Sequence, residues 1–211
     1  MAASHFTLDS ELQKVKLAIL GAPGVGKTSI IQQFVCSHFT EDYEPTESKQ
    51  VYIPSVIIND HLYELKIIDS PYIPYFPVNS LYEWTDFRGY ELRSATAYVL
   101  VYDITSEESF QYIKSLREQI IESRDMQDVP IFVVGNKHDQ AEERGMSRRE
   151  VANVVKKQWK CGYVECSAKY NWHIVLLFKE LMKTIDYIDY GHKPTAIRVQ
   201  DALRRNRCVI L

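Results

Sequence analysis

The chain has 211 residues, of which 45% are apolar and 25% charged, with a net charge of −3 and four cysteines. This length fits one domain with its own core, and no apolar run is long enough to cross a membrane. The cysteines lack metal-binding spacing, the mildly acidic balance argues against nucleic-acid binding, and the N-terminus has neither a secretory signal nor a myristoylation glycine.

The first predicted strand, 15–20, leads into the octapeptide GAPGVGKT at positions 21–28, and an amphipathic helix is predicted from Ser29. The octapeptide fits G-x-x-x-x-G-K-[ST], a loop that directs backbone N–H groups and the positive end of a helix dipole at a phosphate. In such a loop Lys27 reaches the β- and γ-phosphates and the Thr28 hydroxyl ligates Mg²⁺. The alternative is a plain glycine turn between core elements.

The next segments predict a loop and a hairpin. Residues 37–46 are polar, and the apolar segments 51–58 and 62–68 alternate as paired strands do. Pro54 lies inside the first segment, which predicts an edge strand because proline has no N–H to donate.

Residues 70–93 break this pattern. Prolines recur at every third position from 71 to 77, as along one edge of a polyproline II helix, and 80–93 is compatible with a helix interrupted by Gly89. The segment 71–77 is either a partner surface or a stiff loop that packs its aromatic residues on the body.

Alternation of strands and helices resumes after residue 96. Strands are predicted at 97–102, 129–134 and 162–166, with helices after the capping boxes at 105–108 and 147–150 and after Asn171. This order implies a parallel sheet covered on both faces, with ligands at the carboxyl ends of its strands. The phosphate loop, Asp69 and the stretches 136–139 and 167–169 all fall at such ends.

The tetrapeptide Asn136-Lys137-His138-Asp139 indicates which base is bound. The Asp139 carboxylate can accept from both N1–H and the exocyclic amine of guanine, whereas adenine lacks that pair of donors. The stem of Lys137 can lie along the base. A solvated turn is the alternative for the tetrapeptide alone, but the phosphate loop upstream and Ser167-Ala168-Lys169 downstream favour guanine.

On these motifs the chain resembles the Ras superfamily of small GTPases over residues 14–190. The runs 76–79, 159–173 and 202–208 resemble the Ras-like family member 10 proteins more closely. The resemblance implies a three-layer α/β P-loop G domain at 14–190, with a six-stranded, mostly parallel sheet and one antiparallel edge strand. Residues 1–13 would then be an N-terminal extension and 191–211 a basic flexible tail.

The resemblance also implies roles for individual residues in a monomer that binds GTP or GDP with Mg²⁺. Lys27 and Thr46 are expected to act in catalysis, and Thr28, Thr46 and Asp69 to hold Mg²⁺. Phe39 would stack beside guanine. The other nucleotide contacts are expected from Gly21, Gly24, Val25, Gly26, Lys27, Thr28, Ser29, Asn136, Lys137, Asp139, Ser167, Ala168 and Lys169. Effectors, an exchange factor and an activating protein are implied without being identified.

The chain departs from the family at the second switch. Tyr72 stands where the family has the glycine whose N–H meets the γ-phosphate, and Ile73 stands where it has the water-orienting glutamine. Positioning and electrostatics supply nearly all the catalysis of phosphoryl transfer, so weak GTP hydrolysis is predicted unless Asn79 or Asp86 orients the water instead. Pro23 would also crowd an activating arginine.

Two functions from different classes therefore stay open. One is a slow GTPase that acts as a membrane-anchored signalling switch, and the other is a GTP-binding interaction module that hardly hydrolyses. An ATP-using kinase is disfavoured by residues 136–139.

The tail predicts a membrane anchor. Residues 191–211 contain five basic residues and one acidic residue, a net +4, whereas the other 190 residues carry −7. The last four residues, beginning at Cys208, fit C-a-a-X, and the terminal leucine favours geranylgeranyl. A lipid and a basic cluster together predict attachment to the anionic cytoplasmic face of the plasma membrane. A nuclear address and an ordinary apolar terminus are the alternatives.

Overall fold

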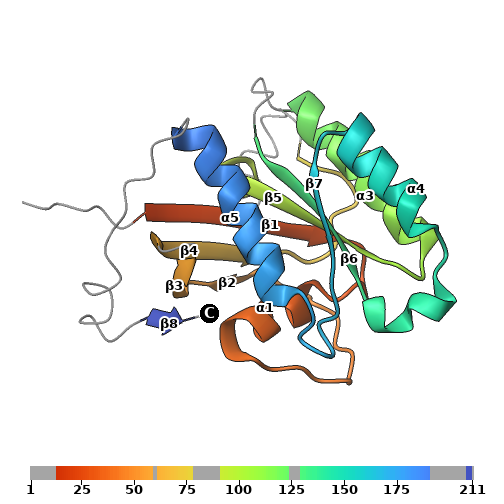
Figure 1. Ribbon diagram of the computed structural model, residues 1–211, viewed down its shortest axis with the longest axis horizontal. Helices are drawn as coiled ribbons and strands as arrows, with labels where there is room; N and C mark the ends of the chain where they lie inside the picture. The colour runs from red at the N-terminus through yellow and green to blue at the C-terminus, as the bar shows by residue number, and fades with distance from the viewer. Residues whose placement is uncertain (1–12, 59–60, 78–90, 124–128, 191–207, 211) are drawn as a thin grey trace, which may run out of the picture.

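The computed structural model describes residues 13–58, 61–77, 91–123, 129–190 and 208–210 (Figure 1). The strands are β1 (Gln13–Gly21), β2 (Gln50–Tyr52), β3 (Ser55–Ile58), β4 (His61–Asp69), β5 (Ala97–Asp103), β6 (Ile131–Asn136), β7 (Gly162–Glu165) and β8 (Cys208–Ile210). The helices are α1 (Lys27–Cys36), α3 (Glu107–Ser123), α4 (Arg148–Asn153) and α5 (Ile174–Tyr190), with a 3₁₀ turn at His138–Glu143 and a π-helical turn at Val154–Gln158.

Several predictions concern residues outside this set. Residues 1–12 of the N-terminal extension, most of the helix considered at 80–93 and nearly all of the tail lie outside the described residues, whereas Gln13 begins β1. Within the described ranges, no helix is both long and apolar enough to cross a membrane.

The strands form one sheet in the order β7-β6-β5-β1-β4-β3-β8, and β2 also pairs with β4. The central strands β7, β6, β5, β1 and β4 run parallel, whereas β2 and β3 run antiparallel to β4. The predicted α/β fold with a mostly parallel sheet is therefore confirmed.

Helices cover both faces of this sheet (Figure 1). Leu17 and Ile19 of β1 pack into a core with residues of α1 and α5, whereas the alternate residues Ala18 and Leu20 pack into a core with residues of α3 and α4. This alternation follows from the two-residue repeat of a strand, and it explains why β1 reads as a continuous apolar run.

The number of strands differs from the predicted six. The predicted edge strand 51–58 is divided into β2 and β3 around Pro54, which cannot donate to a ladder. The Pro54 carbonyl still accepts from the backbone N–H of Leu65 on β4, at 3.0 Å. The three-residue strand β8 lies parallel to β3, and the sequence did not predict it.

Two predicted helix starts are also shifted. Ser106, not Thr105, caps α3, because its hydroxyl accepts from the N–H of Ser109 at 3.1 Å while the Thr105 hydroxyl donates to Asp103 at 2.8 Å. Asn171 lies in a left-handed conformation, φ 54°, in the turn before α5. Polar residues of this kind are common in turns as well as at caps, so the pattern alone does not fix the first helical residue.

Candidate functional site

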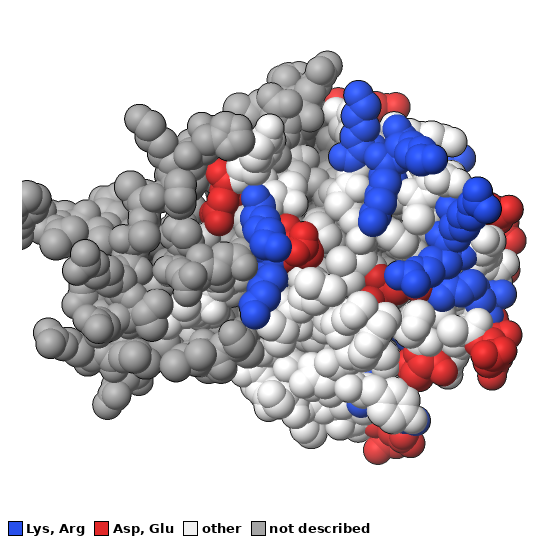
Figure 2. Space-filling model, in the orientation of Figure 1, with Lys and Arg blue, Asp and Glu red and all other residues white. Residues whose placement is uncertain are grey.

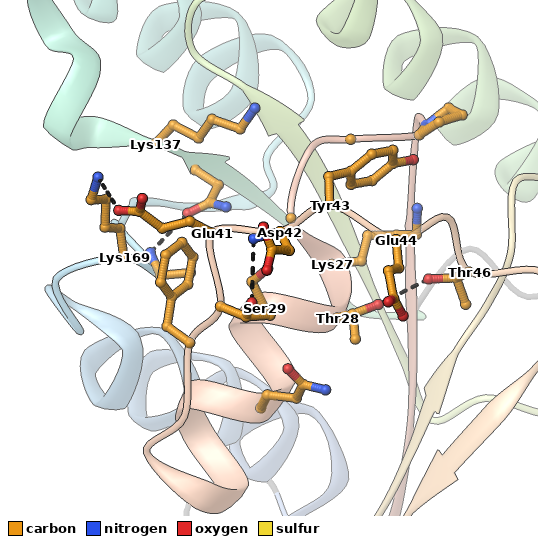
Figure 3. A pocket seen from close by; sticks show the side chains of 18 of the residues that line it. Lys27, Thr28, Ser29, Glu41, Asp42, Tyr43, Glu44, Thr46, Lys137 and Lys169 are labelled. Carbon is orange, nitrogen blue, oxygen red and sulfur yellow. Dashed lines mark hydrogen bonds and ion pairs between the residues drawn. The ribbon is translucent and has the colours of Figure 1, made fainter.

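A cavity of about 820 Å³ lies at the carboxyl ends of the parallel strands (Figure 3). Its walls are the phosphate loop with the start of α1, the loop 38–46, Tyr72, and the turns that follow β6 and β7. The predicted site residues that line it are Gly24, Gly26, Lys27, Thr28, Ser29, Phe39, Thr46, Asn136, Lys137, Asp139, Ala168 and Lys169. Gly21, Val25, Asp69 and Ser167 contact lining residues from behind, and Cys208 belongs to β8.

Lys27 lies almost fully buried at the floor of the phosphate loop. Its Nζ donates to the carbonyls of Gly21 and Ala22, at 3.0 and 3.1 Å. Burial lowers the pKa of Lys27, and the nearby Asp69 carboxylate partly offsets that effect. An ammonium held in this way has a strong electrostatic preference for an anionic ligand in the cavity.

Gly26 joins the phosphate loop to the turn after β6. It precedes α1 with φ 91°, a left-handed conformation that favours glycine, and a side chain there would collide with the Asn136 amide. The same amide donates to the carbonyl of Val25 at 2.9 Å. The phosphate end and the base end are therefore held in one rigid arrangement.

Three oxygen-bearing side chains meet beside the phosphate loop. The Thr28 hydroxyl donates to one Asp69 oxygen at 2.7 Å. It also lies 3.0 Å from the Thr46 hydroxyl (Figure 3). The other Asp69 oxygen is buried without a hydrogen-bond partner, and burial raises the pKa of this carboxyl.

These donors fit Mg²⁺, which prefers hard oxygen ligands and usually keeps sites for water and phosphate oxygens. Among the residues that the structure describes, no group of three or more His, Cys, Asp or Glu side chains gathers to hold a metal. The Thr28, Thr46 and Asp69 set therefore depends on hydroxyls and on the oxygens of a bound nucleotide.

The base end is built by the turns after β6 and β7. The Ser167 hydroxyl donates to Asp139 at 2.5 Å, and the Ala168 N–H donates to the Asn136 side-chain oxygen at 3.1 Å. The two turns that the sequence predicted to read guanine thus lie side by side, with Asp139 lining the cavity.

Sequence reasoning missed two residues that position this end. Asp103, at the end of β5, forms an ion pair with Lys137 Nζ at 2.7 Å. This contact anchors Lys137, whose backbone is in the left-handed conformation with φ 63°. Gln33 of α1 is buried and donates to the carbonyl of Ala168 at 2.7 Å. Asp103 could have been found as an acidic residue at a strand end, and Gln33 as a polar residue next to the apolar face of its helix.

A third missed residue, Glu165, lies fully buried behind the base end. Its carboxylate accepts from Arg144 at 2.8 and 2.9 Å and from the Tyr163 hydroxyl at 2.6 Å, and it lies 3.1 Å from His138 Nδ1. Burial alone would raise the pKa of Glu165, but these hydrogen bonds outweigh it and the pKa lies below its ordinary value. The cluster ties the turn after β6 to the end of β7.

The second-switch segment, residues 70–77, is pinned to α3. The Ile73 carbonyl accepts from the Tyr112 hydroxyl at 2.6 Å, and the Ile73 side chain packs against the core on that face. Phe76 is fully buried, and its N–H donates to the Gln119 side chain at 2.7 Å. A stiff loop that packs on the body is therefore the correct description of this inner edge.

The outer edge of the same segment is exposed. Tyr72 and Tyr75 are 50% and 56% exposed, and Tyr72 lines the cavity while its ring lies 5.4 Å from that of Tyr112. These two side chains keep the alternative of a partner surface open.

Comparison with known proteins places this geometry in a family. The Ras family model matches residues 16–187. The chain is 50% identical to Ras-like protein family member 10B of Homo sapiens, over 93% of this chain and 98% of that protein. It is 44% identical to Ras-like protein family member 10A of Mus musculus, over 93% of this chain and 98% of that protein. It is 32% identical to GTP-binding protein Di-Ras2 of Macaca fascicularis, over 93% of this chain and 96% of that protein.

Small GTPases of this family bind GTP and GDP, generally with Mg²⁺, and hydrolyse GTP. A family model that covers most of the chain and a relative at 50% identity agree with the fold and with the cavity at the carboxyl ends of the strands. This chain belongs to the Ras family of small GTPases.

Proposed function

We propose that this chain is a membrane-anchored switch that binds GTP and GDP with Mg²⁺ and hydrolyses GTP slowly. The observation that supports it most is that Lys27, Thr28 and Asp139 line one cavity, with Asp69 directly behind Thr28 and hydrogen-bonded to it. These groups match the chemistry of a guanosine phosphate. The Lys27 cation suits its phosphates, the oxygen ligands suit Mg²⁺, and the Asp139 carboxylate at the other end of the cavity suits guanine.

Each group has a defined part in binding. Lys27 and the N–H groups at the start of α1 stabilise phosphate oxygens, while Thr28, Thr46 and Asp69 would hold Mg²⁺, which would neutralise charge on those oxygens. Asp139, oriented by Ser167, accepts from N1–H and the exocyclic amine of guanine. An adenine there would leave the carboxylate unpaired, which costs far more than a missing apolar contact.

Slow hydrolysis is supported by the surroundings of Ile73. Its side chain is aliphatic and packs toward the core, so it has neither the chemistry nor the direction needed to orient an attacking water. Tyr72 adds an aromatic ring to the cavity wall beside it. Because this reaction depends on positioned donors and acceptors, the loss leaves Lys27 and the magnesium ligands as the main catalytic groups.

The second candidate, an interaction module that hardly hydrolyses GTP, is supported by the pinned segment 70–77. Its contacts to Tyr112 and Gln119 come from α3 and not from the cavity, so its position does not depend on the γ-phosphate. A partner bound to Tyr72 and Tyr75 would then respond little to which nucleotide is present.

Membrane attachment is proposed from the C-a-a-X sequence at Cys208 and the basic tail that precedes it. A basic surface on the folded domain adds support. Figure 2 shows Lys and Arg side chains gathered on the part of this face that carries α4. The exposed basic residues of α4 and the turn after it are Arg148, Arg149, Lys156, Lys157 and Lys160.

The experiment is to identify the nucleotide that copurifies with the full-length chain and to time single-turnover GTP hydrolysis with Mg²⁺. We expect GDP or GTP at about one per chain and slow hydrolysis that Ile73→Gln accelerates. If Ile73→Gln is no faster, the missing glutamine is not what limits the chemistry. If the wild-type chain hydrolyses no measurable GTP, the interaction module becomes the better description.

A further inference from the structure

The loop that borders the cavity, residues 37–49, is joined to the opposite wall at both ends of the cavity (Figure 3). At the phosphate end the Thr46 hydroxyl lies 3.0 Å from that of Thr28. At the base end the Glu41 carboxylate lies 2.7 Å from Lys169 Nζ. The second contact has no part in the binding scheme above, and the sequence did not predict it.

The Glu41–Lys169 pair is exposed but specific. The two side chains are 74% and 41% exposed, and the hydrogen bond between them lowers the pKa of Glu41 and raises that of Lys169. Lys169 directly follows Ala168, whose N–H lies at the base end of the cavity. The pair therefore connects the covering loop to the turn against which the base is expected to rest.

We propose that this ion pair is a latch that retains the nucleotide, with Glu41 as a positioning residue that acts through Lys169. Glu41 holds the loop 37–49 against the base wall and slows the release of the bound nucleotide. The latch rests on the proposed binding of guanine nucleotides. The latch lies at the base end of the cavity, and GDP and GTP have the same base, so the latch should retain both nucleotides equally. Thr46 lies at the phosphate end, where GTP differs from GDP by its γ-phosphate.

The test measures dissociation of fluorescently labelled GDP and of a labelled non-hydrolysable GTP analogue from the full-length chain. Glu41→Gln should release both nucleotides about two- to fivefold faster at low salt, the range expected for one exposed ion pair. Glu47→Gln is the matched control, because it removes the same charge from an exposed position in the same loop. The difference between the two variants should shrink near 1 M salt, where the screening length falls to about 3 Å.

A charge swap separates the ion pair from other effects of either residue. Lys169→Glu alone should release nucleotide faster than wild type, and the double variant Glu41→Lys with Lys169→Glu should restore release to within about twofold of wild type. A structural role of Glu41 that does not involve Lys169 would give no such rescue.

Three results would overturn the latch: equal release from Glu41→Gln and Glu47→Gln, acceleration of only one of the two nucleotides, or a double variant without rescue. Failure of the wild-type chain to take up either labelled nucleotide would instead contradict the proposed function, and the latch with it. Normal uptake with unchanged release contradicts the latch alone.

Discussion

In the proposed function, a few side chains decide which base the cavity accepts. Asp139 can read guanine only if its carboxylate is held toward the cavity, and the hydrogen bond from Ser167 at 2.5 Å holds it there. Neither residue acts alone, because Ser167 also accepts from the backbone N–H of Tyr170 at 3.2 Å and so ties the carboxylate to the turn after β7.

Ser167→Ala should weaken GDP binding about tenfold, since a hydrogen bond to a charged group is worth roughly 1.5–3 kcal/mol and Asp139 can recover part of it from water. Equilibrium titration with labelled GDP measures the change. Ser147→Ala is a suitable control, because Ser147 is exposed and its side chain makes no capping hydrogen bond to α4. Equal GDP affinity in the two variants would contradict this role for Ser167.

Glu165 should stabilise the fold in a way that depends on pH. The pKa of Glu165 lies below its ordinary value, so its charge contributes stability above about pH 4.3, and that contribution is lost as the pH falls through the folded-state pKa. Glu165→Gln should lower the free energy of unfolding by about 3 kcal/mol at pH 7, because it leaves Arg144 without its buried partner.

Urea unfolding of wild type and Glu165→Gln between pH 7 and pH 3 measures that difference. The gap should narrow as the pH falls through the lowered folded-state pKa of Glu165, where the wild-type carboxyl also becomes neutral. A gap that stays constant across this range would show that the charge of Glu165 is not the source of the stability.

Different elements of the fold carry the binding residues and hold the segment 70–77 in place. The turns after β1, β6 and β7 carry the residues proposed to bind the nucleotide, whereas α3 holds the segment 70–77 through Tyr112 and Gln119. In this family the second switch senses the γ-phosphate by changing conformation. Because α3 anchors the corresponding segment 70–77 here, we expect that segment to keep one conformation.

Releasing that anchor should help a glutamine at position 73 reach the cavity. Tyr112→Phe removes the hydrogen bond to the Ile73 carbonyl, which is worth about 1 kcal/mol. The double variant Tyr112→Phe with Ile73→Gln should therefore hydrolyse GTP faster than Ile73→Gln alone, and Tyr112→Phe alone should match wild type. Identical single-turnover rates for the double variant and Ile73→Gln would show that the anchor does not restrain this segment.

Local sequence patterns predicted the strands and helices well, because the periodicity of a strand or helix depends on residues that are neighbours in the sequence. The buried strand β1, the phosphate loop and the interruption at Pro54 all follow from short-range chemistry. The capping residue of α3 was shifted by one because Thr105 donates to Asp103 instead. The three-residue strand β8 has too little pattern of its own to be read from sequence.

The sequence predicted the motifs of the candidate site but not the contacts that hold those motifs in place. Lys27, Asp69 and Asp139 could be named because Asp69 ends β4, and Lys27 and Asp139 belong to recognisable motifs that follow β1 and β6. The helix pattern could have marked Gln33 as unusual, but not its partner Ala168, which is 135 residues away. The contact of Glu41 with Lys169 could not be predicted, because only the fold brings these two residues together. Contacts of this kind depend on tertiary structure, which no local pattern contains.

At the level of the whole molecule, a folded nucleotide domain is joined to a tail of opposite charge. Three arginines, Arg204, Arg205 and Arg207, lie immediately before the C-a-a-X sequence. A single lipid chain binds a membrane only marginally, so these charges should supply a large share of the attachment to an anionic surface.

Cys208→Ser should move the chain from the membrane fraction to the soluble fraction of cells. Changing the three arginines to glutamine in the lipid-modified chain should reduce its partition into phosphatidylserine vesicles about 100-fold at physiological salt, at about 1 kcal/mol per charge. Partition into neutral phosphatidylcholine vesicles should stay unchanged. An undiminished membrane pool for Cys208→Ser would contradict the lipid anchor.

The most direct test of the central claim is a competition measurement on the full-length chain with Mg²⁺, in which labelled GDP is displaced by GTP, GDP or ATP. The cavity predicts displacement by GTP and GDP at equal, low concentrations and no displacement by ATP at concentrations 1,000-fold higher, roughly the discrimination expected when a buried carboxylate would lose both of its partners. Displacement by ATP as effective as that by GTP would contradict a cavity in which Lys27 binds the phosphates and Asp139 selects guanine.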